Sequence, residues 1–385
     1  MIKKLKLTFL FQRYILFLLA TLLLNNCVTE FIPHTSEYKE LLVVEGLITN
    51  MPEAYTIKLS RPQQLGLPSR PNPVVGCVVN VSDDSGQSFS FSEKAPGIYV
   101  SNPSDFQGVV GRFYTLHITT DLNSNNLKYE SVPMELRAVP PIDSIYYEKV
   151  TLAESSPNTI FQEGCKIFLD THDSTNQCKY LRWEYSETWE VHIPYTVPNN
   201  TCWITNNSDV INIKSTTVLA EDKVLRYPLN LVTNSTDKLA TKYSIQVNQY
   251  SMNEDEYLYW EKSLNTSEQV GGLYDMLPAS VPSNVYNSDY PDEKVLGYFS
   301  VSGKTSKRIF VKDRFSGVLN PYTNDICIAD TIWGVMSDPI RDLGTSVWVI
   351  ISHPLPPPAY RVTTRVKDCY DCTLRGSNIK PDFWQ

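Results

Sequence analysis

The segment Tyr55-Thr56-Ile57-Lys58-Leu59 alternates apolar and polar side chains, which is typical of a β-strand with one buried face. The apolar run Leu41-Leu42-Val43-Val44 precedes it. Similar runs follow roughly every 8–15 residues as far as Ile118, with Gly, Pro, Asn or Asp between them. This spacing predicts an immunoglobulin-like β-sandwich over residues 41–138. No immunoglobulin-type cysteine pair occurs in this region, so the prediction concerns architecture alone.

Val139-Pro140-Pro141 indicates a linker, because adjacent prolines stiffen and extend a chain. The remainder, residues 139–385, predicts a larger β-rich domain, so that the fold class is mainly β. Further strands are expected at 142–147, 167–170, 180–191, 242–250, 295–301 and 346–352.

One short helix is expected within the second domain. Ser251 and Glu254 have the spacing of a capping box, in which each side chain bonds to the other's backbone N–H. Tyr257, Trp260 and Leu264 then fall on one face of a helix of about two to four turns. Gly271-Gly272 is expected to end it.

The N-terminus has the pattern of an export signal over residues 1–26. Basic residues precede an apolar run, Tyr14 to Leu24, that is too short to span a bilayer. The following Leu24-Asn25-Asn26-Cys27 resembles the bacterial lipobox. The resemblance implies cleavage before Cys27 and attachment of diacylglycerol and a further acyl chain such as palmitate to that cysteine. The alternative is a plain cleaved signal peptide in which Cys27 is incidental.

A lipidated Cys27 predicts a protein anchored to the outer membrane, with residues 27–40 as a tether to the first strand. Acyl chains give stable anchoring when more than one is present. Display at the cell surface is favoured over the periplasmic face. An acidic run behind the cysteine is often seen in surface lipoproteins of Bacteroidetes, but here only Glu30 lies close behind Cys27.

The charge of the chain excludes one class of partner. Removal of residues 1–26 takes away four positive charges and no negative one, which lowers the formal net charge from −8 to −12. Nucleic-acid phosphates require clustered Lys and Arg, so no nucleic acid is expected as a partner. Electrostatic adhesion to anionic lipid is disfavoured for the same reason.

Seven cysteines remain besides Cys27, in a chain expected to enter an oxidising compartment where disulfides are the default. The count is odd, and Cys77 is expected to stay reduced and buried within the apolar run 74–79. Cys165 and Cys178 flank a polar turn and could cross-link a hairpin. For the CxxC of Cys369 and Cys372, structural disulfides are favoured over a metal or redox role. The six candidates for pairing are Cys165, Cys178, Cys202, Cys327, Cys369 and Cys372.

No pattern in the sequence predicts catalysis. The five histidines form no metalloprotease or triad-like signature, and neither a GxSxG elbow nor a phosphate-binding glycine-rich loop occurs. The acidic segment 289–293 lacks the ligand spacing of a calcium loop, so a solvated loop is favoured. We therefore expect no catalytic residues, no metal, no cofactor and no enzymatic activity.

Aromatic side chains are dense between residues 183 and 203. Trp183, Tyr185 and Trp189 share one strand face, and such a stripe is usually core because aromatic residues bury large areas. Exposed members would instead form a contact surface for a sugar or a protein. The candidate contact residues are Trp183, Tyr185, Trp189, Tyr195 and Trp203.

Three short motifs resemble the O-glycosylation signal of exported Bacteroidetes proteins. They are Asp143-Ser144-Ile145, Asp173-Ser174-Thr175 and Asp330-Thr331-Ile332. The candidate acceptors are Ser144, Ser174 and Thr331.

Several stretches together resemble one family. They are Val44-Glu45-Gly46, Pro140-Pro141-Ile142-Asp143-Ser144-Ile145, Arg182-Trp183-Glu184-Tyr185, Thr188-Trp189-Glu190, Gln249-Tyr250-Ser251-Met252, Leu296-Gly297-Tyr298-Phe299, Cys372-Thr373-Leu374-Arg375-Gly376 and Lys380-Pro381-Asp382-Phe383-Trp384. Over nearly the whole mature chain they are similar to the Bacteroidetes lipoprotein family catalogued as domain of unknown function 4249. The resemblance implies an outer-membrane lipoprotein, often encoded beside a TonB-dependent receptor, and implies no catalytic residues.

The sequence thus predicts a non-enzymatic lipoprotein that acts as a binding or accessory partner of a TonB-dependent transporter in nutrient capture or uptake. One alternative is a structural or adhesive protein of the cell envelope. Another is an extracytoplasmic hydrolase, which would need converging carboxylates or histidines.

Overall fold

The computed structural model describes residues 41–62, 72–122, 125–152, 162–269, 281, 283–333, 348–353 and 359–384. The predicted signal peptide, the tether and Cys27 therefore lie outside the described residues. Nearly all described elements belong to one compact unit made of Leu41–Ser60 and Pro73–Gln385. The chain is mainly β, as predicted. No helix in the described residues combines the length and apolar character needed to cross a bilayer.

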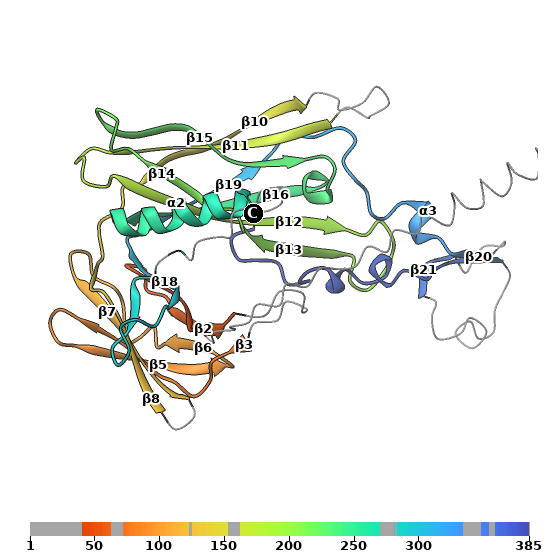
Figure 1. The fold of residues 1–385 in the computed structure, drawn as a ribbon. Coiled ribbons are helices and arrows are strands. Elements are labelled where there is room, and N and C mark those ends of the chain that lie inside the picture. The colour runs from red at the N-terminus through yellow and green to blue at the C-terminus, as the bar shows by residue number, and fades with distance from the viewer. Residues whose placement is uncertain are drawn as a thin grey trace, which may run out of the picture. The chain divides into compact units, whose positions relative to one another are not determined.

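The N-terminal strands form one continuous curled sheet (Figure 1), with the order β17-β8-β7-β4-β5-β6-β2-β1-β18 and with β3 on β2 and β9 on β7. The strands are β1 (Val43–Thr49), β2 (Thr56–Arg61), β3 (Asn72–Pro73), β4 (Val78–Asp83), β5 (Ser88–Ala95), β6 (Ile98–Ser101), β7 (Phe113–Leu122), β8 (Asn125–Ser131), β9 (Met134–Glu135), β17 (Val285–Asn287) and β18 (Leu296–Ser302).

The alternation of apolar and polar residues leading into and along β2 gives one buried face, as predicted. Tyr55, Ile57 and Leu59 are all buried, whereas Lys58 is exposed. Their neighbours in the core come from β1, β4, β7 and β18. The immunoglobulin-like character of this sheet and the division of the chain at residue 139 stay predictions.

Two strands from far along the chain join this sheet. β17 pairs with β8, and β18 runs parallel to β1 with Val44 opposite Gly297. Gly297 has φ +80°, and a Cβ at that position would lie 2.0 Å from the carbonyl oxygen of Val44. Only glycine tolerates both the left-handed backbone and this close approach. The motifs Val44-Glu45-Gly46 and Leu296-Gly297-Tyr298-Phe299 therefore meet as neighbouring strands.

A second core lies between two further sheets, one with the order β10-β11-β15 and one with the order β13-β12-β16-β19, to which β14 adds at β12. Their strands are β10 (Ile142–Leu152), β11 (Gln162–Asp173), β15 (Asp222–Thr233), β12 (Tyr180–His192), β13 (Thr201–Asn207), β14 (Asn212–Ser215), β16 (Lys242–Met252) and β19 (Lys304–Val311). A small sheet of β20 (Asp330–Trp333), β22 (Tyr360–Thr364) and β21 (Trp348–His353) follows.

The predicted helix is confirmed as α2 (Glu254–Gln269), which lies against β12 and β14 (Figure 1). Its cap differs from the prediction. The side chain of Asn253 accepts the backbone N–H of Glu256 at 2.8 Å. Ser251 instead lies near the end of β16, where its hydroxyl donates to the carbonyl of Arg137 and accepts the N–H of Gly303. The predicted end at Gly271-Gly272 lies outside the described residues.

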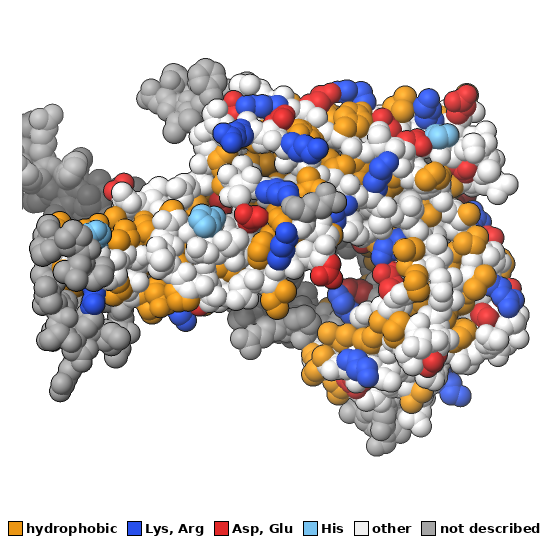
Figure 2. All heavy atoms as spheres, turned by 180° about the vertical axis from the view of Figure 1, so that it is seen from behind, with side chains coloured by type: hydrophobic (Ala, Val, Ile, Leu, Met, Phe, Trp, Pro, Cys, Tyr) orange, Lys and Arg blue, Asp and Glu red, His pale blue; other side chains and the backbone are white. Residues whose placement is uncertain are grey.

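The other helical segments among the described residues are single turns. They are α3 (Asn324–Cys327) and the 3-10 turns Asp237–Leu239, Lys367–Cys369 and Cys372–Leu374. On the face drawn in Figure 2, acidic and basic side chains are interspersed over the described surface. The described part of that face therefore carries no large patch of one sign.

Candidate functional site

A pocket of about 280 Å³ opens where β1, β2, β12, β18 and α2 meet. This volume is near the lower end of the ~300–1,000 Å³ typical of ligand sites. Glu45 and Lys58 line it with exposed side chains, so it is accessible to solvent. The remaining lining residues are Gly46, Leu47, Thr56, Arg182, Glu184, Tyr259, Trp260, Tyr298 and Ser300.

Arg182 is the central charge of this pocket. It lies on the face of β12 opposite to the Trp183 stripe, and its guanidinium carbon is 4.9 Å from the ring centre of Tyr250 and 4.6 Å from that of Trp260. Its Nη1 donates to Oε1 of Glu184 at 2.6 Å. The Nε–H is buried and has no hydrogen-bond partner among the described residues. The two rings and the carboxylate therefore hold the guanidinium in place while one of its donors stays unused.

Glu256, on the first turn of α2, contacts the wall of the same pocket. Its Oε1 accepts the hydroxyl of Ser300 at 2.6 Å and the indole N–H of Trp260 at 3.4 Å. Its Oε2 has no partner within the described part of the chain. Burial raises the pKa of Glu256 above its ordinary value of 4.5, and the positive charge of Arg182 opposes that rise.

Tyr298 of β18 supplies a third buried polar atom. Its ring centre lies 4.7 Å from that of Tyr259, and its hydroxyl finds no hydrogen-bond partner in the described residues. Burial raises the pKa of Tyr298, and the nearby charge of Glu256 adds to that rise. Three unpartnered polar atoms thus belong to residues that line the pocket or bond directly to its lining.

A larger cavity of about 630 Å³ lies along the linker and the turn after β11, but its charged side chains and His172 already have partners. Arg137 donates to Glu135 at 3.1 Å, and His172 lies 2.7 Å from Asp143. The carboxylate of Asp173 accepts bonds within its own turn. Although burial opposes it, these bonds lower the pKa of Asp173 to about 2. The smaller pocket is therefore the better candidate for a binding site.

The comparison with family models agrees with the resemblance noted in the sequence. The model described as Domain of unknown function (DUF4249) matches residues 28–308. The chain belongs to the DUF4249 family. All residues that line the 280 Å³ pocket fall inside the matched region. A search of curated proteins found no match.

The resemblance was expected over nearly the whole mature chain, but the match to the DUF4249 model ends at Arg308. The C-terminal motif therefore lies beyond it and has a clear structural role. Arg375 donates to Asp237 at 2.7 Å and to Tyr322 at 3.0 Å. The buried indole of Trp384 donates to Glu190 of β12 at 3.1 Å. This motif fastens the C-terminus to the second core.

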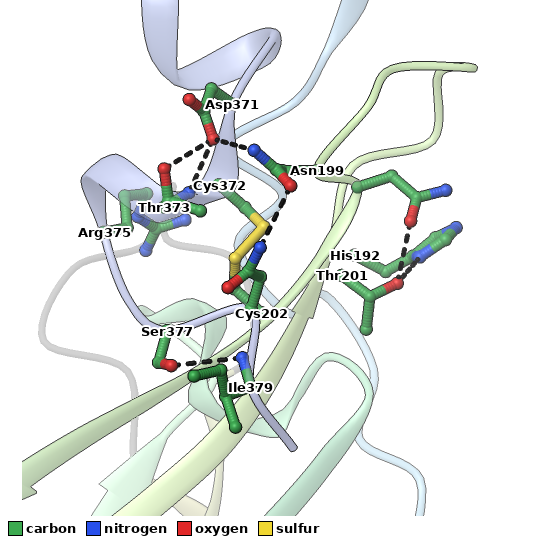
Figure 3. Close-up of a disulfide and its surroundings, with 12 residues drawn as sticks. His192, Asn199, Thr201, Cys202, Asp371, Cys372, Thr373, Arg375, Ser377 and Ile379 are labelled. Carbon is green, nitrogen blue, oxygen red and sulfur yellow. Dashed lines mark hydrogen bonds between the residues drawn. A yellow bond between two sulfur atoms is a disulfide. The ribbon is translucent and has the colours of Figure 1, made fainter.

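The CxxC of this DUF4249 chain forms two structural disulfides, as favoured from the sequence. Cys372 bonds to Cys202, and Cys369 bonds to Cys327. Figure 3 shows the Cys202–Cys372 bond beside Asp371, which accepts the side-chain amide of Asn199 and the hydroxyl of Thr373. The two cysteines of the motif bond to different partners and not to each other, unlike those of a redox-active CxxC.

The expected pairing of Cys165 and Cys178 is wrong. Both are buried thiols, and burial raises the pKa of each to about 12. Cys165 lies early in β11, whereas Cys178 lies beside Asp173 at the far end of that strand. The intervening extended strand is roughly 26 Å long, whereas a disulfide needs Cα atoms within about 7 Å. Cys77 keeps its thiol as predicted, but it is half-buried instead of buried.

The aromatic stripe belongs to the hydrophobic core, as favoured from the sequence. Its buried members therefore cannot form a contact surface. Trp183, Tyr185, Trp189 and Tyr195 are all buried, and Trp203 is half-buried. The indole N–H of Trp183 donates a hydrogen bond to the side-chain oxygen of Gln249 on β16 at 2.8 Å. Because β12 is covered on that face by β11 and β15, its aromatic side chains pack inward.

The remaining sequence candidates lie apart from the pocket. Ser174 is exposed in a turn, whereas Ser144 and Thr331 are half-buried on strands, and their glycosylation stays a prediction. In the acidic segment 289–293, Asp289 accepts the backbone N–H of Lys128, and Glu293 accepts the hydroxyl of Tyr129 and the amide of Asn287. No cluster of three metal-ligating side chains occurs within the described ranges.

Sequence reasoning missed the pocket residues as a site. Arg182, Glu184 and Tyr298 stood in the quoted motifs, but they were used only to mark the family. The available signal was the charged pair Arg182 and Glu184, which alternates with Trp183 on a strand expected to be covered on one face. Glu256 gave no comparable signal, because acidic residues are ordinary in the first turn of a helix.

Proposed function

We propose that this chain is a lipid-anchored outer-membrane protein that acts by binding, as an accessory partner of a TonB-dependent transporter in nutrient capture or uptake, and that it catalyses no reaction. The observation that carries the binding role is the solvent-accessible pocket of about 280 Å³, which is lined by the charged side chain of Arg182 and by the aromatic side chains of Tyr259, Trp260 and Tyr298. Ligand sites in proteins are typically concave and largely apolar or aromatic, with a few polar groups that orient the ligand, and this lining has that composition.

The sequence before Cys27 supports the anchor, and the two disulfides support an exported location. Disulfides persist in oxidising compartments and are rare where thiols are kept reduced. The proposed anchor is diacylglycerol with a further acyl chain on Cys27, and the proposed location is the cell-surface side of the outer membrane.

The anchor is tested by metabolic labelling with an alkyne fatty acid. The wild-type chain should take up the label, and Cys27→Ala should remain uncleaved or be released without it. Cys77→Ala is the matched control, because it removes a different cysteine that forms no disulfide. It should label like the wild type. Unchanged labelling of Cys27→Ala would refute the lipoprotein proposal.

A further inference from the structure

Glu187 of β12 is a charged residue on the buried aromatic face of that strand. It shares this face with Trp183, Tyr185 and Trp189, so its side chain points into the second core, and the residue is only 6% exposed. A carboxylate is rarely buried this far unless neighbouring groups pair with it. Its partners therefore determine the chemistry that is available to Glu187.

Three side chains donate hydrogen bonds to this carboxylate. Nζ of Lys238, on the 3-10 turn that follows β15, donates to Oε2 at 2.6 Å. Nδ2 of Asn230, on β15 itself, donates to Oε1 at 3.1 Å. The hydroxyl of Tyr243 on β16 donates to the same oxygen at 2.6 Å. One carboxylate thus holds a lysine amine and an asparagine carboxamide at once.

This arrangement contains the parts needed for acyl transfer between the two side chains. A proton can pass along the hydrogen bond from Nζ of Lys238 to Glu187, which leaves an amine, the nucleophilic form of lysine. The leaving nitrogen, Nδ2 of Asn230, is already bonded to the same carboxyl group, which can return a proton to it. The Lys238 and Glu187 side chains are 23% and 8% exposed, so little water reaches the pair.

The bonds from Tyr243 and Lys238 also fix the orientation of the carboxylate. Burial raises the pKa of Tyr243 well above its ordinary value of 10, and the charge of Glu187 adds to that rise. The hydroxyl of Tyr243 therefore stays protonated and donates to Oε1. Nζ of Lys238 also lies 5.3 Å from the ring centre of Trp189, which forms part of the wall around the carboxylate.

We propose that Lys238 and Asn230 form an isopeptide cross-link, with Glu187 as the catalytic residue. A bond forms between Nζ and Cγ of Asn230, Glu187 takes a proton from Nζ and gives one to Nδ2, and the Cγ–Nδ2 bond breaks. Nζ loses two protons in all, and both leave with the departing nitrogen as ammonium. The step needs no oxidant or second reactant. Because each chain reacts once with itself, the step is not turnover of a substrate.

Tryptic digestion of the purified full chain followed by tandem mass spectrometry tests the cross-link. Trypsin normally cuts after Lys238, but a lysine in an amide bond is not cut. The wild-type chain should yield the peptide 227–242 uncut and lighter by about 17 Da, the mass of one ammonia. Fragmentation should place the link between residues 230 and 238. A peptide 227–238 of full mass from the wild-type chain overturns the proposal.

Two variants test the assigned roles. Glu187→Gln keeps the shape of the side chain but cannot carry the proton, and Lys238→Arg keeps a positive charge beside Glu187 but supplies no amine. Both should yield the peptide 227–238 at full mass. Lys179→Arg is the matched control, because Lys179 pairs with Asp222 at 2.8 Å in the same way. It should keep the lighter, uncut peptide.

Circular dichroism shows whether each variant is folded, and Lys238→Arg gives the test if Glu187→Gln is not. A succinimide at Asn230 would also remove ammonia, but it does not need Lys238. Loss of ammonia that persists in Lys238→Arg therefore overturns the proposal, as does the lighter peptide in folded Glu187→Gln.

Discussion

Glu256 is a carboxylate that the fold buries completely at the start of a helix. Burial raises the pKa of Glu256 and outweighs the charge of Arg182 and the hydrogen bonds from Ser300 and Trp260, which favour the charged form. A folded state with a raised carboxyl pKa binds more protons than the unfolded chain between the two pKa values. Stability due to Glu256 therefore falls as the pH rises from about 4.5.

Glu256→Gln should remove this pH dependence, because the amide does not ionise. We expect the variant to gain stability relative to wild type as the pH rises from acid to neutral, with a gain of about 0.5–2 kcal/mol at neutral pH. Below the unfolded pKa, where wild-type Glu256 is protonated in both states, the gain should disappear. Urea unfolding across that range measures it, and a difference that is constant with pH contradicts the prediction.

At the scale of elements, β12 explains why one part of the site was predictable and another was not. Its odd-numbered residues 183, 185 and 189 pack into the second core, as the alternation indicated. Its even-numbered residues Arg182 and Glu184 line the pocket, because α2 and β18 approach that face. Alternation separates two faces, but it carries no information about which distant element covers each face.

The pairing of β1 with β18 is another contact that local pattern could not predict. Both runs were recognisable as strands, but about 250 residues separate them and nothing in either run specifies a parallel partner. Local pattern could not predict the disulfide pairing either, because the partners are far apart in the sequence. The cysteines after residue 160 were expected to pair, yet only the fold brings Cys202 to Cys372 and leaves Cys165 far from Cys178.

Gly297→Ala tests the parallel pairing directly. The change should cost about 3 kcal/mol or more, because φ +80° strains an alanine and its Cβ would overlap the Val44 carbonyl oxygen. Gly86→Ala is the matched control, since Gly86 has φ +86° with no atom within 4 Å of the added carbon. It should cost only about 1 kcal/mol. Denaturant unfolding measures both, and equal costs would show that β18 does not approach β1 this closely.

At the scale of the whole molecule, composition and pattern were sufficient to predict a mainly β chain and the helix α2, because strand alternation and helix periodicity are local properties. The short helix α3 was not predicted. The connection of residues 285–302 with the N-terminal sheet was not predictable, because it depends on long-range packing. The pocket arises from that same connection, since β18 brings Tyr298 and Ser300 to Arg182 and α2.

The accessory role is a claim about the whole molecule in its membrane, and it is tested most directly by isolating the tagged chain at native expression after chemical cross-linking in intact cells. Mass spectrometry should find one β-barrel receptor enriched with the wild-type chain in roughly equimolar amount. The enrichment should be lost with Cys27→Ala, which keeps the folded domains and removes the proposed anchor. If no barrel is enriched above that control, the chain is not the partner of a TonB-dependent transporter.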